Sequence, residues 1–193
     1  MKKQKILAKI NKRLFVAVPV SEKVKDRIKP VVDELSKTGA DLKLVSLSHL
    51  HFTLKFFGDV DEKKISELEK KLAGISERTK KFAITIKDVG VFPSLERINV
   101  VWIGVEDSLL ASLMKAVNHE LNYIKKNEHE EEVAHLTIAR VKTGRNKKEL
   151  QEFAKKNEKK DFGTMTVDKL ILFESELTKE GSVYKVVGEF ELR

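Results

Sequence analysis

The sequence contains no cysteine among its 193 residues. Disulfide bonds, thiolate ligands for zinc and cysteine nucleophiles are therefore excluded. It also lacks a glycine-rich phosphate loop, which argues against ATP binding through that motif.

Long apolar runs are absent as well. No stretch approaches the length needed to cross a membrane, and the charges within Met1–Lys12 interrupt any secretory signal. We therefore expect a cytoplasmic protein that has no membrane partner, and we expect it to be a monomer.

Acidic residues are fewer than basic ones. The chain has 38 Lys and Arg against 30 Asp and Glu, a formal net charge of +8 at pH 7. Such an excess favours an anionic partner, of which nucleic acid is the commonest, although lysine-rich surfaces also serve solubility. The net charge is therefore consistent with nucleic-acid binding but does not identify a function.

Short β-branched segments alternate with amphipathic ones along the chain, and the alternation predicts several strands and helices. Pro30 lies inside the first helical pattern and argues against an unbroken helix there, and Gly181 predicts a turn between the last two strands. The expected strands are Arg13–Val20, Leu47–Phe57, Phe82–Val91, Ile98–Val105, Val133–Val141, Phe162–Glu174 and Ser182–Leu192, and the expected helices are Val24–Leu35, Asp61–Ile75, Asp107–Ile124 and Asn146–Lys156.

The order of these elements repeats. One strand–helix–strand unit runs from Arg13–Val20 to the strand at His51, and a second runs from Ile98–Val105 to the strand at His135. The Pro and Gly turns and the closing pair of strands favour antiparallel pairing. We therefore predict an α+β fold: a single bilobal domain over residues 1–193, with two similar lobes of antiparallel sheet plus helices and a central cleft.

The second strand of each unit carries the same short pattern, His-x-Thr flanked by apolar residues. Because successive side chains of a strand point to opposite faces, the histidine and the threonine share one face while the apolar residues point into a lobe core. One His-x-Thr could be structural, but two copies at matching places favour a functional role. The two copies read His51-Phe52-Thr53-Leu54 and His135-Leu136-Thr137-Ile138.

Two imidazoles and two hydroxyls are the groups that phosphoester cleavage needs. One imidazole can remove a proton from water while the other protonates the leaving oxygen, since the ordinary histidine pKa of about 6.5 permits both roles near neutral pH. The threonine hydroxyls can donate hydrogen bonds to phosphoryl oxygens. This reasoning alone does not assign which histidine is the acid.

With these motifs, the chain resembles the two-histidine (HXTX) phosphoesterase superfamily and, within it, the RNA 2',3'-cyclic phosphodiesterases once called 2'-5' RNA ligases. The resemblance implies a bilobal fold with no metal and no cofactor, His51 as proton donor and His135 as proton acceptor, and a 2'-phosphate product. It also implies RNA with 2',3'-cyclic phosphate ends, tRNA halves included, as the partner. The resemblance runs through RLFVAVPV, SHLHFTLKFFGDV, GVFPSLERINVVWIGV, AHLTIARVK and LILFESELTKEGSVYKVVGEFEL.

Ala134 and Arg140 lie on either side of the second motif. Relatives often have proline just before the second histidine, where this chain has Ala134, but that position carries no chemistry. Arg140 is a candidate phosphate ligand, with Thr53 and Thr137. It lies an odd number of residues from His135, so an ideal strand turns it to the opposite face and phosphate contact requires a bulge or a strand end.

Alternatives remain open. The resemblance permits reversible 2'-5' ligation or action on a small cyclic nucleotide such as ADP-ribose 1'',2''-cyclic phosphate, and a non-catalytic RNA- or nucleotide-binding module could use the same cleft. His49 and His51 could begin a zinc site, but no third ligand lies at suitable spacing, so His49 is expected at the cleft rim. The acidic run Glu128–Glu132 is expected to be a solvated loop rather than a cation site.

Overall fold

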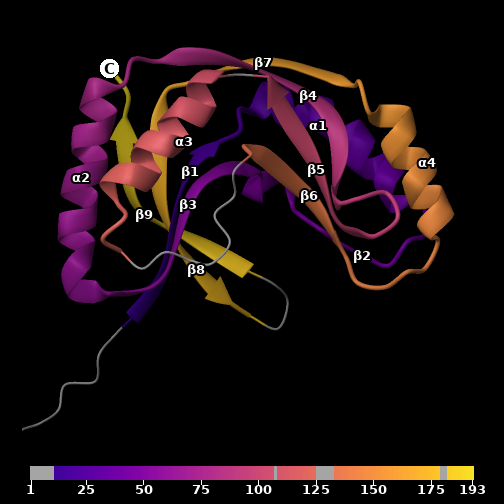
Figure 1. Cartoon of the computed structure of the whole chain (residues 1–193), viewed down its shortest axis with the longest axis horizontal. Helices are drawn as coiled ribbons and strands as arrows, with labels where there is room; N and C mark the ends of the chain where they lie inside the picture. The colour runs from indigo at the N-terminus through magenta and orange to yellow at the C-terminus, as the bar shows by residue number, and fades with distance from the viewer. Residues whose placement is uncertain (1–10, 107, 125–132, 179–181) are drawn as a thin grey trace, which may run out of the picture.

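The computed structural model describes residues 11–106, 108–124, 133–178 and 182–193 (Figure 1). The expected turn at Gly181 and the acidic run Glu128–Glu132 lie outside the described residues. Within the described ranges, no helix is long and apolar enough to cross a membrane.

Strands of the described residues form two antiparallel sheets, which confirms the predicted α+β class. The first sheet has the order β3-β1-β8-β9, and the second has the order β2-β6-β5-β4-β7. The bounds are β1 Asn11–Pro19, β2 Leu42–Leu44, β3 His51–Asp61, β4 Phe82–Pro93, β5 Ile98–Glu106, β6 His135–Val141, β7 Asp161–Val167, β8 Lys169–Leu177 and β9 Ser182–Glu191.

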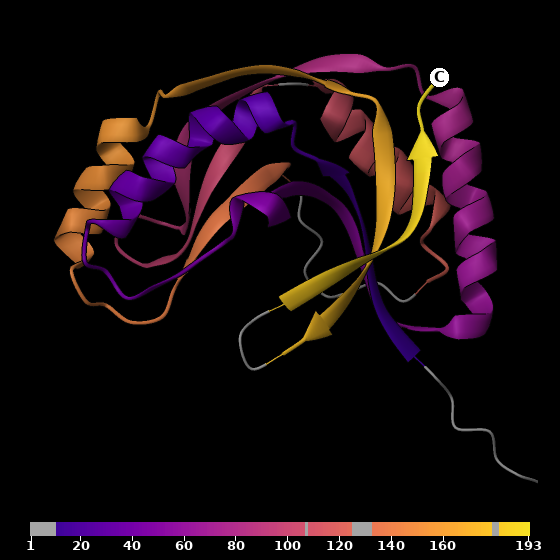
Figure 2. The ribbon, with the colours of Figure 1, turned by 180° about the vertical axis from the view of Figure 1, so that it is seen from behind.

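Two helices cover the outer face of each sheet (Figures 1 and 2). Helices α2 and α3 pack on β9 and β3 of the first sheet, and α1 and α4 pack on β7 and β4 of the second. Helix α1 follows β1 of the first sheet but packs on the second sheet, and α3 follows β5 of the second sheet but packs on the first. The two halves of the chain are therefore interleaved. The helices are α1 Glu22–Ser36, α2 Ile65–Arg78, α3 Ser108–Glu120 and α4 Lys147–Asn157, with short 3-10 turns η1 Leu47–His49 and η2 Glu62–Lys64.

Helix α1 is unbroken, so the inference drawn from Pro30 was wrong. Proline inside a helix costs about 3 kcal/mol, but each fully buried aliphatic side chain contributes roughly 1.5–3 kcal/mol. Pro30 itself is exposed, on the face away from the core. The core side of α1 buries Val24, Ile28, Val31, Val32 and Leu35.

The segment Phe162–Glu174, expected as one strand, is two strands in different sheets. Strand β7 pairs with β4 in the second sheet, and β8 pairs with β1 in the first. Asp168 lies between them, and its carbonyl accepts a hydrogen bond from Leu192 N at 2.7 Å. Only the charged pair Asp168-Lys169 separates the apolar residues on the two sides of this crossing, with no proline or glycine, so the sequence did not indicate a change of sheet.

The strand expected at Leu47–Phe57 was also misplaced. Residues Leu47–His49 form η1, and β3 runs from His51 to Asp61, past the expected stop at Gly58. Gly58 adopts φ +66° and pairs with Leu14 next to a register shift, so it bends the strand without ending it. The short strand β2 was not predicted, because three residues are too few to establish a period.

Gly90 is required by the packing of Trp102. A Cβ added at Gly90 would overlap the six-membered part of the Trp102 ring, whereas a Cβ at Gly144 would meet nothing within 4 Å. Gly90 and Trp102 face each other across the β4–β5 pair.

The substitution Gly90→Ala should therefore lower the free energy of unfolding by roughly 1–3 kcal/mol through overpacking. Thermal or denaturant unfolding measures the loss, with Gly144→Ala as the matched control. Adding Trp102→Leu to Gly90→Ala should recover part of the lost stability. Equal midpoints for the two glycine variants would contradict this packing.

Candidate active site

The two histidine strands meet where the two sheets face each other. Strand β3 is an outer strand of the first sheet, β6 belongs to the second, and the two strands are in contact. A pocket of about 80 Å³ opens between them. The five residues predicted from the sequence all line it, and the complete lining is Val45, His49, His51, Thr53, Phe56, His135, Thr137, Arg140 and Tyr184.

Each motif divides its side chains as strand alternation predicts. Phe52 and Leu54 of β3 are at most 1% exposed and belong to the hydrophobic core, and Leu136 and Ile138 of β6 are fully buried. The histidine and threonine of each motif take the other face and reach the pocket. Core burial of the apolar pair thus holds each strand in the register that presents its polar pair.

The two imidazoles are held by the same hydrogen bond. Nδ1 of His51 lies 2.7 Å from the carbonyl oxygen of His49, and Nδ1 of His135 lies 2.8 Å from the carbonyl oxygen of Val133. A carbonyl can only accept, so Nδ1 carries the hydrogen in both rings. The lone pair of each neutral imidazole is then on Nε2, so Nε2 is the nitrogen that can accept a proton.

Aromatic rings lie close to both histidines. The His51 ring lies 4.9 Å from Phe15 and 5.5 Å from Tyr184, and the His135 ring lies 5.1 Å from Phe92, edge to face. Burial lowers the pKa of His51 to about 4, against the hydrogen bond to the His49 carbonyl, which raises it; the charge of the His49 ring lowers it slightly. In the free protein, His51 is therefore neutral at pH 7.

A β-bulge follows the threonine in both motifs. On β6, Thr137 pairs with Trp102 and Ala139 with Val101, so Ile138 is the extra residue. On β3, Leu54 is the extra residue at the same place in the motif. The sequence required a bulge or a strand end for Arg140 to reach the face of His135. The β6 bulge reverses the alternation in this way, and the exposed side chain of Arg140 lines the pocket.

Three pocket residues were missed by the sequence reasoning. Phe56 is five residues after His51, the position that Arg140 holds after His135, so comparing the two motifs further downstream would have found it. Val45 and Tyr184 carry no local signal, since strand pairing alone brings them to the pocket. His49 lines the rim as expected, with its ring 5.0 Å from that of Tyr184.

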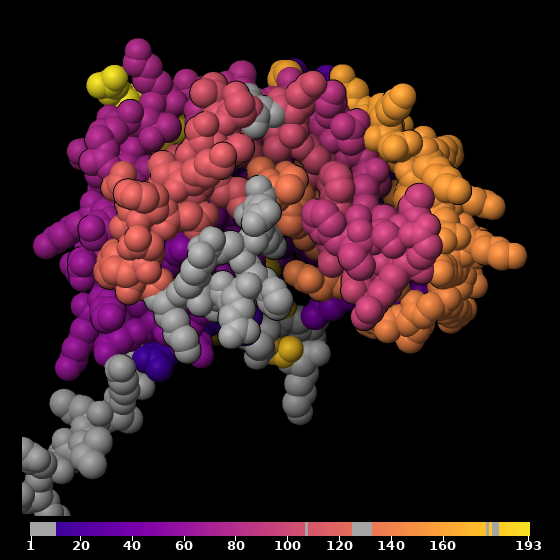
Figure 3. Space-filling model, viewed as in Figure 1, coloured from indigo at the N-terminus to yellow at the C-terminus, as the bar shows by residue number. Residues whose placement is uncertain are grey.

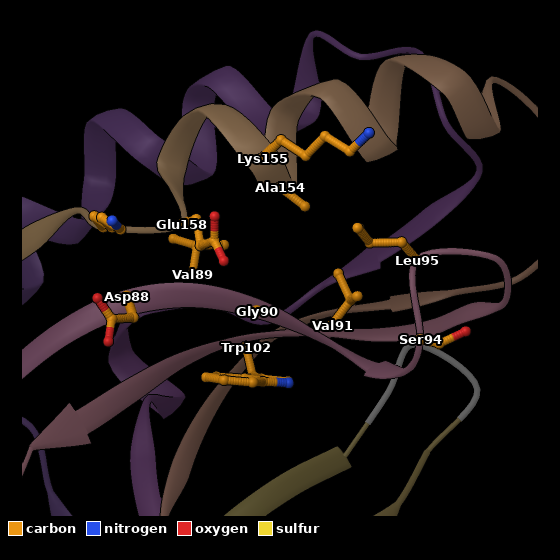
Figure 4. Close-up of a pocket in the computed structure, with 11 residues that line it drawn as sticks. Asp88, Val89, Gly90, Val91, Ser94, Leu95, Trp102, Ala154, Lys155 and Glu158 are labelled. Carbon is orange, nitrogen blue, oxygen red and sulfur yellow. The ribbon is translucent and has the colours of Figure 1, made fainter.

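No group of three or more His, Asp or Glu residues in the described parts of the chain is arranged to hold a metal ion. A larger hollow, of about 520 Å³, lies elsewhere, between α4 and the edge of β4 (Figure 4). Its lining includes Val89, Leu95 and Ala154 but neither histidine motif. Both histidine motifs therefore lie in the small pocket.

Comparison with known families and proteins agrees with this geometry. A family model described as LigT like Phosphoesterase matches residues 18–102 and 103–184, one match for each half of the chain. An RNA 2',3'-cyclic phosphodiesterase of Methanothermobacter thermautotrophicus is 35% identical over 93% of this chain and 98% of its own length. One of Archaeoglobus fulgidus is 36% identical, over 93% of this chain and 99% of its own length.

Solved structures show the same fold. TT0787 of Thermus thermophilus superimposes with a TM-score of 0.79 at 23% identity, covering 94% of this chain and 98% of that one. Escherichia coli LigT complexed with 3'-AMP gives a TM-score of 0.73 at 21% identity, with the same coverage. The overall fold is therefore shared.

The pKa of His51 leads to a prediction about stability. An unfolded histidine titrates near 6.5 and His51 in the folded chain near 4, so the unfolded chain binds more protons between these values. The free energy of unfolding should therefore fall as the pH is lowered from about 6.5 to 4. Unfolding curves across this window test it, and His51→Gln should remove part of the slope.

Side-chain NMR measures the same group directly. The His51 ring should titrate near pH 4 in the free protein, and inorganic phosphate should raise that value because an anion in the pocket stabilises the imidazolium. A His51 pKa of 6.5 or above in the free protein would contradict the burial argument.

Proposed function

Because the chain belongs to the LigT-like phosphoesterase family, we propose that it hydrolyses 2',3'-cyclic phosphate ends of RNA to a 2'-phosphate, with His51 as acid and His135 as base. The observation that carries the proposal is the pair of His-x-Thr motifs in one pocket, both with Nδ1 bonded to the carbonyl two residues earlier. The similar archaeal proteins named RNA 2',3'-cyclic phosphodiesterase support the choice of substrate.

In the proposed reaction, water attacks phosphorus in line with the bond to the 3' oxygen. Nε2 of His135 takes a proton from the water as the new P–O bond forms. The P–O3' bond breaks, and Nε2–H of His51 gives its proton to the departing 3' oxygen. The products are a 2'-phosphate and a 3'-hydroxyl, and the proton taken up by one ring equals the proton lost by the other.

His51 must acquire its proton with the substrate. Its pKa of about 4 leaves it neutral in the free protein at pH 7, but the negative charge of the cyclic phosphate favours the imidazolium beside it. Substrate binding thus favours protonation of His51, so this acid has a proton to donate only when a phosphate is bound.

Phosphate recognition is assigned to Thr53, Thr137 and Arg140, which line the same pocket. The hydroxyls and the guanidinium can donate to the non-bridging oxygens, whose charge needs compensation as the transition state forms. We propose that no metal or other cofactor takes part. A cyclic phosphate on one half of a cleaved tRNA fits this assignment, and rejoining of RNA ends is the same chemistry in reverse.

Single substitutions test the two histidines. His51→Ala and His135→Ala should each lower kcat on an RNA with a 2',3'-cyclic phosphate end by roughly 10²–10⁴-fold, since each removes a proton-transfer group. His119→Ala is the control, because His119 lies exposed on α3 and outside the pocket.

Thr53→Val and Thr137→Val should each lower kcat/KM on the same RNA, because each removes a hydrogen bond to a non-bridging oxygen. Full turnover in both histidine variants would overturn the mechanism. If the wild-type chain forms no product and the two histidine variants bind the RNA as tightly as the wild type does, the chain is a binding module instead.

A further inference from the structure

The catalytic pocket is too small for the rest of its proposed substrate. About 80 Å³ suits a phosphoryl group, whereas pockets that enclose a small organic molecule measure roughly 300–1,000 Å³. The terminal nucleoside and the phosphodiester on its 5' side must therefore lie on surfaces outside the pocket. Strand register identifies what those surfaces offer.

On the second sheet, Arg140 is part of a row that crosses four strands. Arg140 faces Lys43 of β2 on one side and Val100 of β5 on the other, and Val100 faces Phe92 of β4. Residues paired across antiparallel strands share a face, so Lys43 shares the cleft face with Arg140. Neighbouring strands are about 4.8 Å apart, which puts Lys43 one strand beyond the residue that lines the pocket.

Lys43 and Arg140 form a like-charged pair without a carboxylate. Like charges placed directly opposite each other destabilise a sheet. Both side chains are exposed, and neither makes an ion pair or side-chain hydrogen bond with any residue that the structure describes. By contrast, Lys185 and Lys169 on β9 and β8 are each paired with a glutamate. A bound anion would remove the repulsion between Lys43 and Arg140.

The equivalent row on the first sheet has no charge. Phe56, at the position of Arg140, faces Phe15, which faces Phe173, which faces Val186. The ring centroid of Phe15 lies 5.5 Å from that of Phe56 and 5.1 Å from that of Phe173. One wall of the cleft is therefore aromatic and the other cationic, so an anionic chain leaving the pocket is favoured along the second sheet.

More cations continue beyond the end of β6. A hollow of about 370 Å³ lies where the β4–β5 turn meets the start of α4, on the flank formed by the pink and orange segments in Figure 3. The lining of this hollow carries one carboxylate, Glu96, and four cations, Arg97, Lys142, Arg145 and Lys147. Of these cations, Lys142 makes an exposed ion pair with Asp41 at 3.8 Å.

We propose that Lys43, beside Arg140, binds the phosphodiester immediately 5' of the reacting end and so makes the enzyme prefer an RNA chain to a mononucleotide. The proposal rests on the function proposed above. Lys43 takes no part in proton transfer, so its contribution should depend on substrate length.

The test compares Lys43→Gln with the wild type on two substrates: a mononucleoside 2',3'-cyclic phosphate, which lacks the second phosphate, and a tetranucleotide with the same end. We expect kcat/KM on the tetranucleotide to fall about three- to tenfold, as for an exposed charge-assisted contact, and on the mononucleotide to change less than twofold. The salt dependence on the tetranucleotide, as log kcat/KM against log salt, should become shallower by about 0.7, the slope of one single-strand phosphate contact. Lys23→Gln, an exposed lysine on the outer helix α1, is the matched control and should leave both substrates unchanged.

Equal losses on both substrates, or no loss on either, would overturn the proposal for Lys43. Failure of the wild type to cleave either substrate would instead contradict the proposed function. The affinity for a tetranucleotide ending in a 2'-phosphate then decides the matter: weaker binding by Lys43→Gln than by Lys23→Gln supports the subsite, and equal binding overturns it.

Discussion

The hydrogen bond from each imidazole Nδ1 to the carbonyl two residues earlier is the constraint on which the site depends. It fixes the tautomer, and therefore the nitrogen that exchanges protons, in both His51 and His135. It uses only backbone next to the histidine itself, so it requires no second side chain that substitution could remove. Two strands with the same local sequence thus hold two imidazoles by the same hydrogen bond, and the fold brings both rings to one pocket.

The two halves are equivalent in backbone and unequal in chemistry. Both strands have a bulge one residue after the threonine, but the residue presented after the bulge is Phe56 in one and Arg140 in the other. Burial among aromatic rings also lowers the pKa of His51 to about 4. One side of the pocket therefore presents an aromatic residue and the other side a cation, so two halves with the same backbone can bind an asymmetric group.

The sequence was sufficient where a local pattern decides the structure. The alternation around His51 and His135 placed their side chains on the pocket face, because burial of Phe52 and Leu136 leaves the strands no other register. It was insufficient where long-range pairing decides. The crossing at Asp168 from one sheet to the other, the contribution of Tyr184, and the packing of each crossover helix on the opposite lobe all depend on contacts between distant segments. The unbroken helix through Pro30 is a case in which tertiary packing outweighed local preference.

The central claim is that two histidines direct a water molecule to phosphorus without help from a metal. Incubation of the purified chain with a short RNA ending in a 2',3'-cyclic phosphate, in ¹⁸O-labelled water with EDTA present, tests it most directly. A metal-free two-histidine mechanism predicts a 2'-phosphate that carries one ¹⁸O atom, formed at the same rate with and without the chelator. A 3'-phosphate product, a product without ¹⁸O, or loss of the reaction in EDTA would contradict it.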